Sequence, residues 1–193
     1  MDEGLTAREQ RLADLWDAHM ALEFARHDAA GTVATMTADT HCNHGPVMTG
    51  GSGTDEMLAF YRDHFIPRIP PDMAMQLISR TVGQNRVVDE QILRFTHTLE
   101  MDWMLPGIAP TGKRIEAVFV VIVQFDDAGK VAHEHIYWDQ ATVLAQLGLI
   151  DAAALPVAGA ESARKVLDQR SCPSNGLIER ASRARARADE SRS

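Results

Sequence analysis

The feature that most constrains the fold is a strand–turn–strand–helix segment in the second half of the chain. Residues 116–125 (EAVFVVIVQF) are mostly apolar and β-branched, which is typical of a central strand buried on both faces. Residues 126–129 (DDAG) predict a hairpin turn. Residues 130–139 predict a partner strand that runs directly into a helix over residues 140–147, which a glycine ends.

The earlier residues predict helices first and strands afterwards. An apolar stripe at Leu12, Trp16, Met20 and Phe24 predicts a long first helix, and Asp28 can cap a short second one. A third helix is expected over residues 57–65 and a last one over 161–169, with strands over 40–47, 75–82 and 86–103 and loops over 50–53 and 105–114. This order predicts an α+β fold, in which the helices cover one face of an antiparallel sheet and leave a pocket between the layers.

Composition narrows the class of protein. The 193 residues favour one domain, and 45% hydrophobic with 24% charged residues is typical of a globular chain. No apolar run approaches the roughly 18–20 residues that cross a membrane, and the acidic first ten residues lack the apolar run of a signal peptide. Two distant cysteines predict free thiols and a cytoplasmic protein.

Charge argues against a nucleic-acid partner. The net charge is -8 and the pI about 5.4, whereas binding to phosphates needs a basic face. The exception is the arginine-rich tail over residues 180–192, which we expect to be flexible and solvated.

A row of polar side chains follows the predicted last strand. His133, His135, Tyr137 and Asp139 occupy alternate positions, so they should point to one face. The apolar strand beside them and the helix after them favour the wall of a cavity over a solvated surface.

Two of these residues also raise the question of a metal. The His133-x-His135 spacing can hold zinc, iron or manganese if other ligands join it. The candidate further ligands are His41, Cys42, His44 and Glu116. No motif of fixed metal spacing connects them, so we expect no metal, and a metalloenzyme stays a weaker option.

Three short motifs carry a resemblance to a known family. They are Thr96-His97, the loop GIAPTG over residues 107–112, and Gly129-Lys130-Val131 followed by Trp138-Asp139 and the closing helix LAQLG over 144–148. In this order the motifs resemble the SnoaL-like polyketide and ester cyclases of the nuclear transport factor two-like superfamily. The resemblance covers most of residues 10–150. It implies a cone-shaped α+β domain over residues 1–150 with a curved sheet, a deep cavity and often a dimer, and it leaves residues 151–193 as an extension.

The resemblance also implies roles for individual residues. It points to Asp139 as a general acid/base, and to His97 as the group that stabilises a developing oxyanion. The alternative for Asp139 is that it caps the helix starting at Gln140, and for His97 that it is a half-buried structural histidine. The expected substrate-binding residues are His44, His135, Tyr137, Tyr61, Trp16, Trp103 and Glu116, although Trp16 in a helical stripe is equally typical of core. The histidines at 133 and 135 depart from the family pattern.

These observations predict an enzyme that needs no cofactor. Its substrate would be a small, mainly apolar carbonyl or ester compound, and its chemistry proton transfer of the cyclase, isomerase, dehydratase or hydrolase type. The alternative is a non-catalytic small-molecule-binding or dimerisation module of the same fold. In either case we expect a homodimer and no membrane partner.

Overall fold

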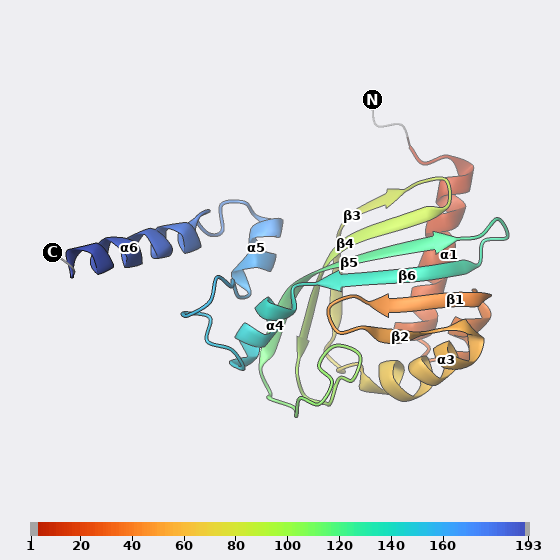
Figure 1. The fold of residues 1–193 in the computed structure, drawn as a ribbon. Helices are drawn as coiled ribbons and strands as arrows, with labels where there is room; N and C mark the ends of the chain where they lie inside the picture. The colour runs from red at the N-terminus through yellow and green to blue at the C-terminus, as the bar shows by residue number, and fades with distance from the viewer. Residues whose placement is uncertain (1–3, 192–193) are drawn as a thin grey trace.

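The computed structural model describes residues 4–191, and its centre is one curved, six-stranded sheet (Figure 1). The elements are α1 (Ala7–Phe24), α2 (Ala29–Ala34), β1 (Met36–His44), β2 (Thr49–Ser52), α3 (Gly53–Ala59), the π-helical turn η1 (Phe60–Phe65), the 3₁₀ turn η2 (Ile66–Arg68), β3 (Ala74–Val82), β4 (Arg86–Thr96), β5 (Arg114–Phe125), β6 (Val131–Trp138), α4 (Gln140–Leu147), α5 (Glu161–Leu167) and α6 (Gly176–Glu190).

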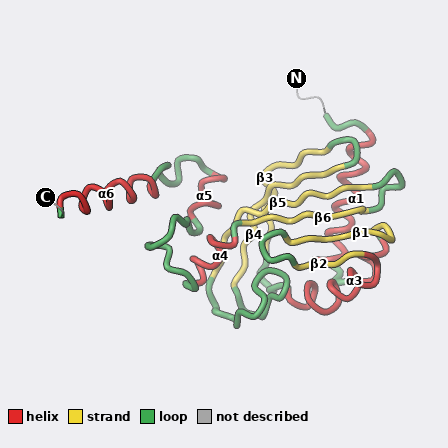
Figure 2. The backbone as a smooth tube through the Cα atoms, in the orientation of Figure 1, coloured by secondary structure: helices red, strands yellow, loops and turns green. Residues whose placement is uncertain are grey.

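The strands lie in the order β2-β1-β6-β5-β4-β3. The pairs β3–β4, β4–β5 and β5–β6 are antiparallel, as the sequence predicted, but β1 pairs with β6 in parallel. The parallel pair arises because the chain enters the sheet from α1 and α2 and places β1 beside the last strand. The α+β class is confirmed, with a curved sheet and the N-terminal helices packed against it (Figure 2).

Helix α1 crosses the sheet and closes one side of the core (Figure 1). It begins with a capping box, in which the Thr6 hydroxyl accepts from the Glu9 backbone N–H and the Glu9 carboxylate accepts from the Thr6 N–H. Its fully buried face carries Leu12, Ala13, Trp16, His19 and Glu23. The predicted stripe through Met20 and Phe24 is therefore rotated slightly, since those two residues are only half-buried.

Strand β6 contains an irregularity that decides which side chains face the core. Val131 pairs with Phe125, whereas His133 pairs with the preceding residue Gln124, so Ala132 forms a β-bulge. The buried positions switch from Val131 to Glu134, Ile136 and Trp138. The prediction that the row of His133, His135, Tyr137 and Asp139 lines the cavity is therefore wrong, because the bulge turns this row to the outer face.

Several predicted boundaries also differ. Strand β4 ends at Thr96 and not at residue 103, because the Asp72 carboxylate accepts hydrogen bonds from the Thr96 backbone N–H and hydroxyl. Residues 50–52, predicted to be a loop, belong to β2, and residue 53 starts α3. Strand β5 is fully buried on its inner face but only half-buried on its outer face.

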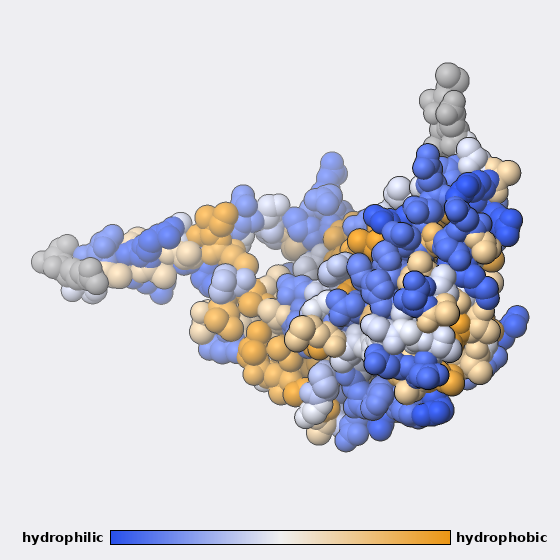
Figure 3. Space-filling view, turned by 45° about the vertical axis from the view of Figure 1, so that its right-hand side comes forward, coloured by the Kyte–Doolittle hydropathy of each residue, from blue (hydrophilic) through white to orange (hydrophobic). Residues whose placement is uncertain are grey.

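The C-terminal extension differs from the expected flexible tail. Helix α5 packs against β5 through the fully buried Ala163, but α6 buries no residue and projects away from the body (Figure 1). The arginine-rich tail is therefore solvated but helical, with Arg192 outside the described residues. Exposed apolar side chains, among them Leu149, Leu155 and Leu167, gather where the extension leaves the body (Figure 3). Within residues 4–191, no helix is long and apolar enough to cross a membrane.

Candidate active site

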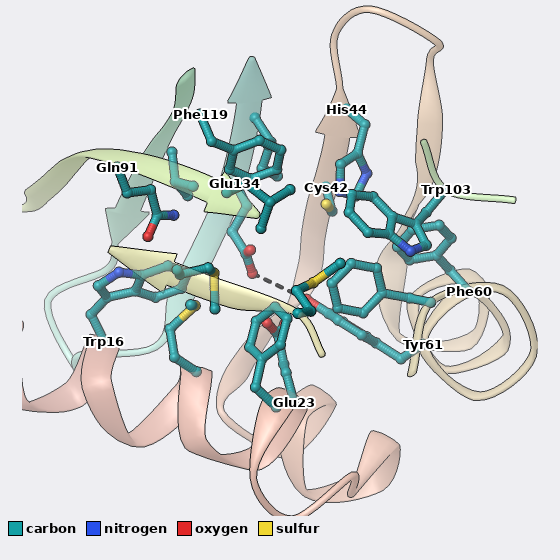
Figure 4. Close-up of a pocket in the computed structure, with 18 residues that line it drawn as sticks. Trp16, Glu23, Cys42, His44, Phe60, Tyr61, Gln91, Trp103, Phe119 and Glu134 are labelled. Carbon is teal, nitrogen blue, oxygen red and sulfur yellow. Dashed lines mark hydrogen bonds between the residues drawn. The ribbon is translucent and has the colours of Figure 1, made fainter. Parts of the chain in front are cut away.

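A mostly apolar cavity lies between α1, the α3–η1 segment and the inner face of the sheet (Figure 4). Its volume is about 30 Å³, which is room for one or two water molecules. Trp16, Phe60, Phe65, Trp103 and Phe119 form much of its wall. The lining residues that are partly exposed are Met20, Phe24, Met73 and Met75, so they mark its mouth. Methionine side chains adapt their shape easily, and a ligand larger than water would enter by moving them.

A cluster of ionisable groups lies at one side of this cavity. His19 Nε2 is 3.2 Å from Glu23 Oε1 and 3.1 Å from Glu134 Oε1. The Tyr61 hydroxyl donates to Glu134 Oε1 over 3.2 Å (Figure 4). All four side chains are buried, and three of them, from α1, η1 and β6, line the cavity. We refer to His19, Glu23, Tyr61 and Glu134 as the buried acid–base cluster.

The orientation of His19 follows from its neighbours. The Thr35 hydroxyl donates to the Thr32 carbonyl, so it accepts from His19 Nδ1–H over 2.6 Å. The ring also stacks on Trp16, with ring centroids 5.3 Å apart. Trp16 is held in turn by its indole N–H, which donates to Asp89 over 2.9 Å. His19 is therefore fixed with Nε2 toward the two carboxylates.

Charge in the cluster is set by burial and by close contact. Burial alone would lower the pKa of His19, but the carboxylates of Glu134 and Glu23 raise it overall to about 10. Burial raises the pKa of Glu23, against the effect of His19. Burial likewise raises the pKa of Tyr61, and the nearby carboxylates add to this shift. Near neutral pH the cluster therefore contains an imidazolium between two carboxyl groups and a protonated phenol.

A neutral histidine lies elsewhere in the same cavity. Burial lowers the pKa of His44 to about 4, so the ring is uncharged at neutral pH. Its Nδ1–H donates to the Thr49 carbonyl over 3.2 Å, which leaves Nε2 as an acceptor. Four aromatic rings, those of Phe60, Phe65, Trp103 and Trp138, lie within 6 Å of the His44 ring, centroid to centroid.

The two residues expected to be catalytic do not share this cavity. Asp139 is exposed and caps α4, where it accepts from the backbone N–H groups of Ala141 and Thr142 and from the Thr142 hydroxyl. His97 is fully buried, but it lies beyond the end of β4 and is not a lining residue. Its Nδ1 accepts from the Thr111 N–H, so Nε2 carries the proton, and this atom has no partner among the described residues. Burial lowers the pKa of His97.

The remaining predicted site residues divide into two groups. Trp16, His44, Tyr61 and Trp103 line the cavity, as expected of pocket residues. His135, Tyr137 and Glu116 do not, because they lie on the outer face of the sheet. Tyr137 is 44% exposed, and Glu116 pairs with Arg94 and Arg164.

The sequence analysis missed His19, Glu23 and Glu134. The sequence did contain a signal for His19 and Glu23. Residues 12, 16, 19 and 23 lie on one face of a helix, just as residues 12, 16, 20 and 24 do. Polar residues on such a face are easily assigned to solvent. Glu134 was hidden by the bulge, which no pattern of alternation reveals.

Comparison with known proteins places this fold in a family. The SnoaL-like domain family matches residues 16–134, more than half of the chain. The chain belongs to the SnoaL-like family. The match spans every member of the buried acid–base cluster, from His19 to Glu134. Comparison with curated proteins finds no significant match.

Solved structures share the fold of this SnoaL-like chain at low sequence identity. A candidate SnoaL-like polyketide cyclase from Jannaschia sp. CCS1 is 17% identical, with a TM-score of 0.59 over 77% of this chain and 99% of that one. The epoxide hydrolase/cyclase-like enzyme SalBIII, connected with pyran ring formation in the polyether salinomycin, is 13% identical, with a TM-score of 0.52 over 67% and 92%. An NTF2-like protein of unknown function from Burkholderia pseudomallei K96243 is 18% identical, with a TM-score of 0.53 over 74% and 98%. At these identities the likeness concerns the fold.

Proposed function

We propose that this SnoaL-like protein is an enzyme that transfers protons on a small, mainly apolar carbonyl or ester compound in the cavity. The observation that carries the proposal is the buried acid–base cluster, in which two carboxyl groups and a phenol line a mostly apolar space and an imidazolium contacts both carboxyl groups. Strongly shifted pKa values inside a cavity are typical of catalytic groups. The names of similar proteins, a cyclase and an epoxide hydrolase/cyclase-like enzyme, agree with this class of chemistry.

In the proposed reaction the Glu134 carboxylate takes a proton from the carbon next to the substrate carbonyl. The electron pair of that C–H bond moves onto the carbonyl oxygen and forms an enolate. The Tyr61 hydroxyl, which burial keeps protonated, is the donor available to stabilise that oxygen. Glu23, whose pKa burial raises, carries a proton and returns it at a different atom, which completes an isomerisation or follows ring closure. His19 Nε2–H then gives its proton to Glu23 and takes the one held by Glu134, which restores both groups.

The other cavity residues would orient the substrate. His44 offers Nε2 as an acceptor for a substrate hydroxyl, and its aromatic surroundings match an apolar ring or chain. The His19 imidazolium holds the two carboxyl groups in place and balances the charge of Glu134. Asp139 has no part in this scheme, because its carboxylate is engaged with the first turn of α4.

A second function has one specific observation in its favour. Within the cluster each group has a partner: Thr35 for His19, His19 for both carboxylates, and Glu134 for Tyr61. Such internal satisfaction also suits a structural core beneath a non-catalytic binding pocket. Homodimer formation and a cytoplasmic location stay predictions for either function.

The experiment that separates the two functions follows α-proton exchange. Small ketones such as 2-tetralone are incubated with the protein in D₂O, and deuterium incorporation is followed by NMR. We expect exchange faster than in buffer and a loss of about 100-fold or more in Glu134→Gln, which is typical for removal of a general base. The matched control is Glu116→Gln, a glutamate on the outer face that pairs with arginines and should leave exchange unchanged.

Ligand binding is measured in parallel by the fluorescence of Trp16 and Trp103, both of which line the cavity. Binding retained in Glu134→Gln with exchange lost supports the enzyme. Binding without any exchange above buffer, in wild type as in the variant, supports the binding module. Equal exchange in wild type and Glu134→Gln would rule out Glu134 as the base.

A further inference from the structure

Three histidines come together on the outer face of the sheet, opposite the cavity. His41 lies on β1, and His133 and His135 lie on β6. The two strands are parallel neighbours, with His41 paired to His133, so the three side chains lie on one face. The Ala132 bulge in β6 turns His133 and His135 to this face, and all three histidines are partly exposed. We refer to His41, His133 and His135 as the outer histidine cluster.

The distance between two of these histidines is that of two ligands around one ion. His41 Nε2 is 3.1 Å from His135 Nε2. Two nitrogens bound to one zinc ion at about 2.0–2.1 Å and separated in this way make an angle of about 100° at the metal, which is close to tetrahedral. The ring of His133 stacks on both others, with centroids 4.5 Å from His135 and 4.9 Å from His41. Rotation about its side-chain bonds would turn one of its nitrogens toward the same point.

The protonation state of the cluster also suits a metal. The contact between His41 Nε2 and His135 Nε2 requires one nitrogen to donate and the other to accept, so one of the two nitrogens is unprotonated, the form that binds metal. Arg86 acts electrostatically on His133 and His135, and its positive charge weakens their attraction for a metal ion.

The other ligands considered from the sequence are excluded by their positions. Cys42 and His44 are buried and line the cavity on the opposite face of β1. Glu116 is engaged with Arg94 and Arg164 on the outer face of the sheet. The outer histidine cluster therefore offers only imidazole ligands from these candidates. Imidazoles favour borderline transition metals over magnesium or calcium.

We propose that the outer histidine cluster is a binding site for a divalent transition metal such as Zn²⁺, with His41 and His135 as the principal ligands and His133 as the third. Water completes the coordination, since the site faces solvent. The ion would replace the hydrogen bond between His41 and His135 and join β1 to β6. The site is independent of the proposed catalytic function, because it lies on the other side of the sheet.

The test is calorimetric titration of the full chain with ZnCl₂ at pH 7.5, after removal of any purification tag and of bound metal by EDTA and dialysis. We expect one equivalent to bind. His41→Ala and His135→Ala should each weaken binding at least tenfold. Loss of a group that only hydrogen-bonds to a metal ligand typically costs about 10–100-fold in affinity, and loss of the ligand itself should cost no less. Binding should weaken as the pH falls toward 5.5, because protons compete for the imidazoles. Zinc should also raise the unfolding temperature of wild type more than that of His41→Ala.

Two control variants make the outcome decisive. His64→Ala removes an exposed histidine elsewhere on the molecule and should leave binding unchanged. Glu23→Gln alters the buried trio of His19, Glu23 and Glu134, whose ligand atoms lie within 4.8 Å of one another and could hold an ion instead, and it should leave binding unchanged as well. Wild-type affinity in both His41→Ala and His135→Ala would overturn the proposal. So would loss of binding in Glu23→Gln alone, since that result would place the ion in the cavity.

Discussion

The charge of the buried acid–base cluster leads to a quantitative prediction about stability. His19 has a pKa of about 10 in the folded chain against an ordinary value of 6.5. Burial works against this rise, and contact with Glu134 and Glu23 outweighs it. A group with a raised pKa stabilises the folded state fully below the unfolded pKa, and this contribution is lost as the pH rises through the folded pKa. The window for His19 therefore runs from about pH 6.5 to about pH 10.

The size of the effect follows from the two pKa values. They give His19 a contribution of about 4 kcal/mol at pH 7 and about 2 kcal/mol at pH 8.5. The free energy of unfolding should therefore fall by about 2 kcal/mol between these two pH values because of His19. The raised pKa of Glu23 acts in the same direction. Burial also raises the pKa values of Cys42 and Tyr61, so measurements above pH 8.5 would mix several groups.

The assay is urea unfolding of wild type and of His19→Gln at pH 7.0, 7.5, 8.0 and 8.5, with the slope of each transition compared to check that unfolding stays two-state. Groups other than the cluster cancel in the difference between the two proteins. We expect this difference to shrink by about 2 kcal/mol across the range. Glu134→Gln removes one of the carboxylates that raise the pKa, so its pH dependence should be weaker than that of wild type. Parallel curves for wild type and His19→Gln would refute the imidazolium between two carboxylates.

Three further predictions concern the stability of the structure around the site. Asp139→Ala should lower the free energy of unfolding by about 1 kcal/mol, measured in urea, because α4 loses its N-cap, and it should leave proton exchange unchanged. Gly50 has φ +142° and a Cβ there would lie 2.0 Å from the Cys42 carbonyl oxygen, whereas Gly53 has φ +75° and no atom nearer than 3.7 Å. Gly53→Ala should therefore cost about 1–2 kcal/mol and Gly50→Ala clearly more in the same unfolding assay, and equal losses would contradict the clash. Deletion of residues 176–193 should change stability by less than about 1 kcal/mol, since α6 buries nothing, and a larger loss by calorimetry would show that α6 supports the domain.

The fold was largely predictable because local signals and tertiary structure agree. The β-branched run of β5, the turn at 126–129 and the polar N-cap of α4 each act over a few residues, and each appears in the structure where the sequence placed it. The parallel pairing of β1 with β6 was not predictable, because no local pattern records which strand a segment will lie beside. The early end of β4 depended on Asp72, which is distant in sequence.

The site was less predictable than the fold because one residue forms a bulge in β6. Alternation assigns a face to every second side chain, and a single extra residue reverses the assignment for the rest of the strand. Ala132 is that residue, so His135 faces outward and Glu134 faces the cavity. Tyr61 and His44 were expected as pocket residues from the family resemblance, and both line the cavity, although Tyr61 lies in the π-helical turn η1.

The parallel pairing of β1 with β6 also sets the order in which the chain can mature on the ribosome. Strands β1 and β2 have no other neighbour in the sheet, and their only large partner begins at Val131. At about 5–20 residues per second, the ribosome needs several seconds to make the intervening residues. During that interval the buried face of α1, with Trp16, His19 and Glu23, has no β6 to pack against. The nascent chain therefore exposes the unpaired edge of β1 and its future charged cluster until the last strand emerges, which makes this first third the segment that a chaperone would protect.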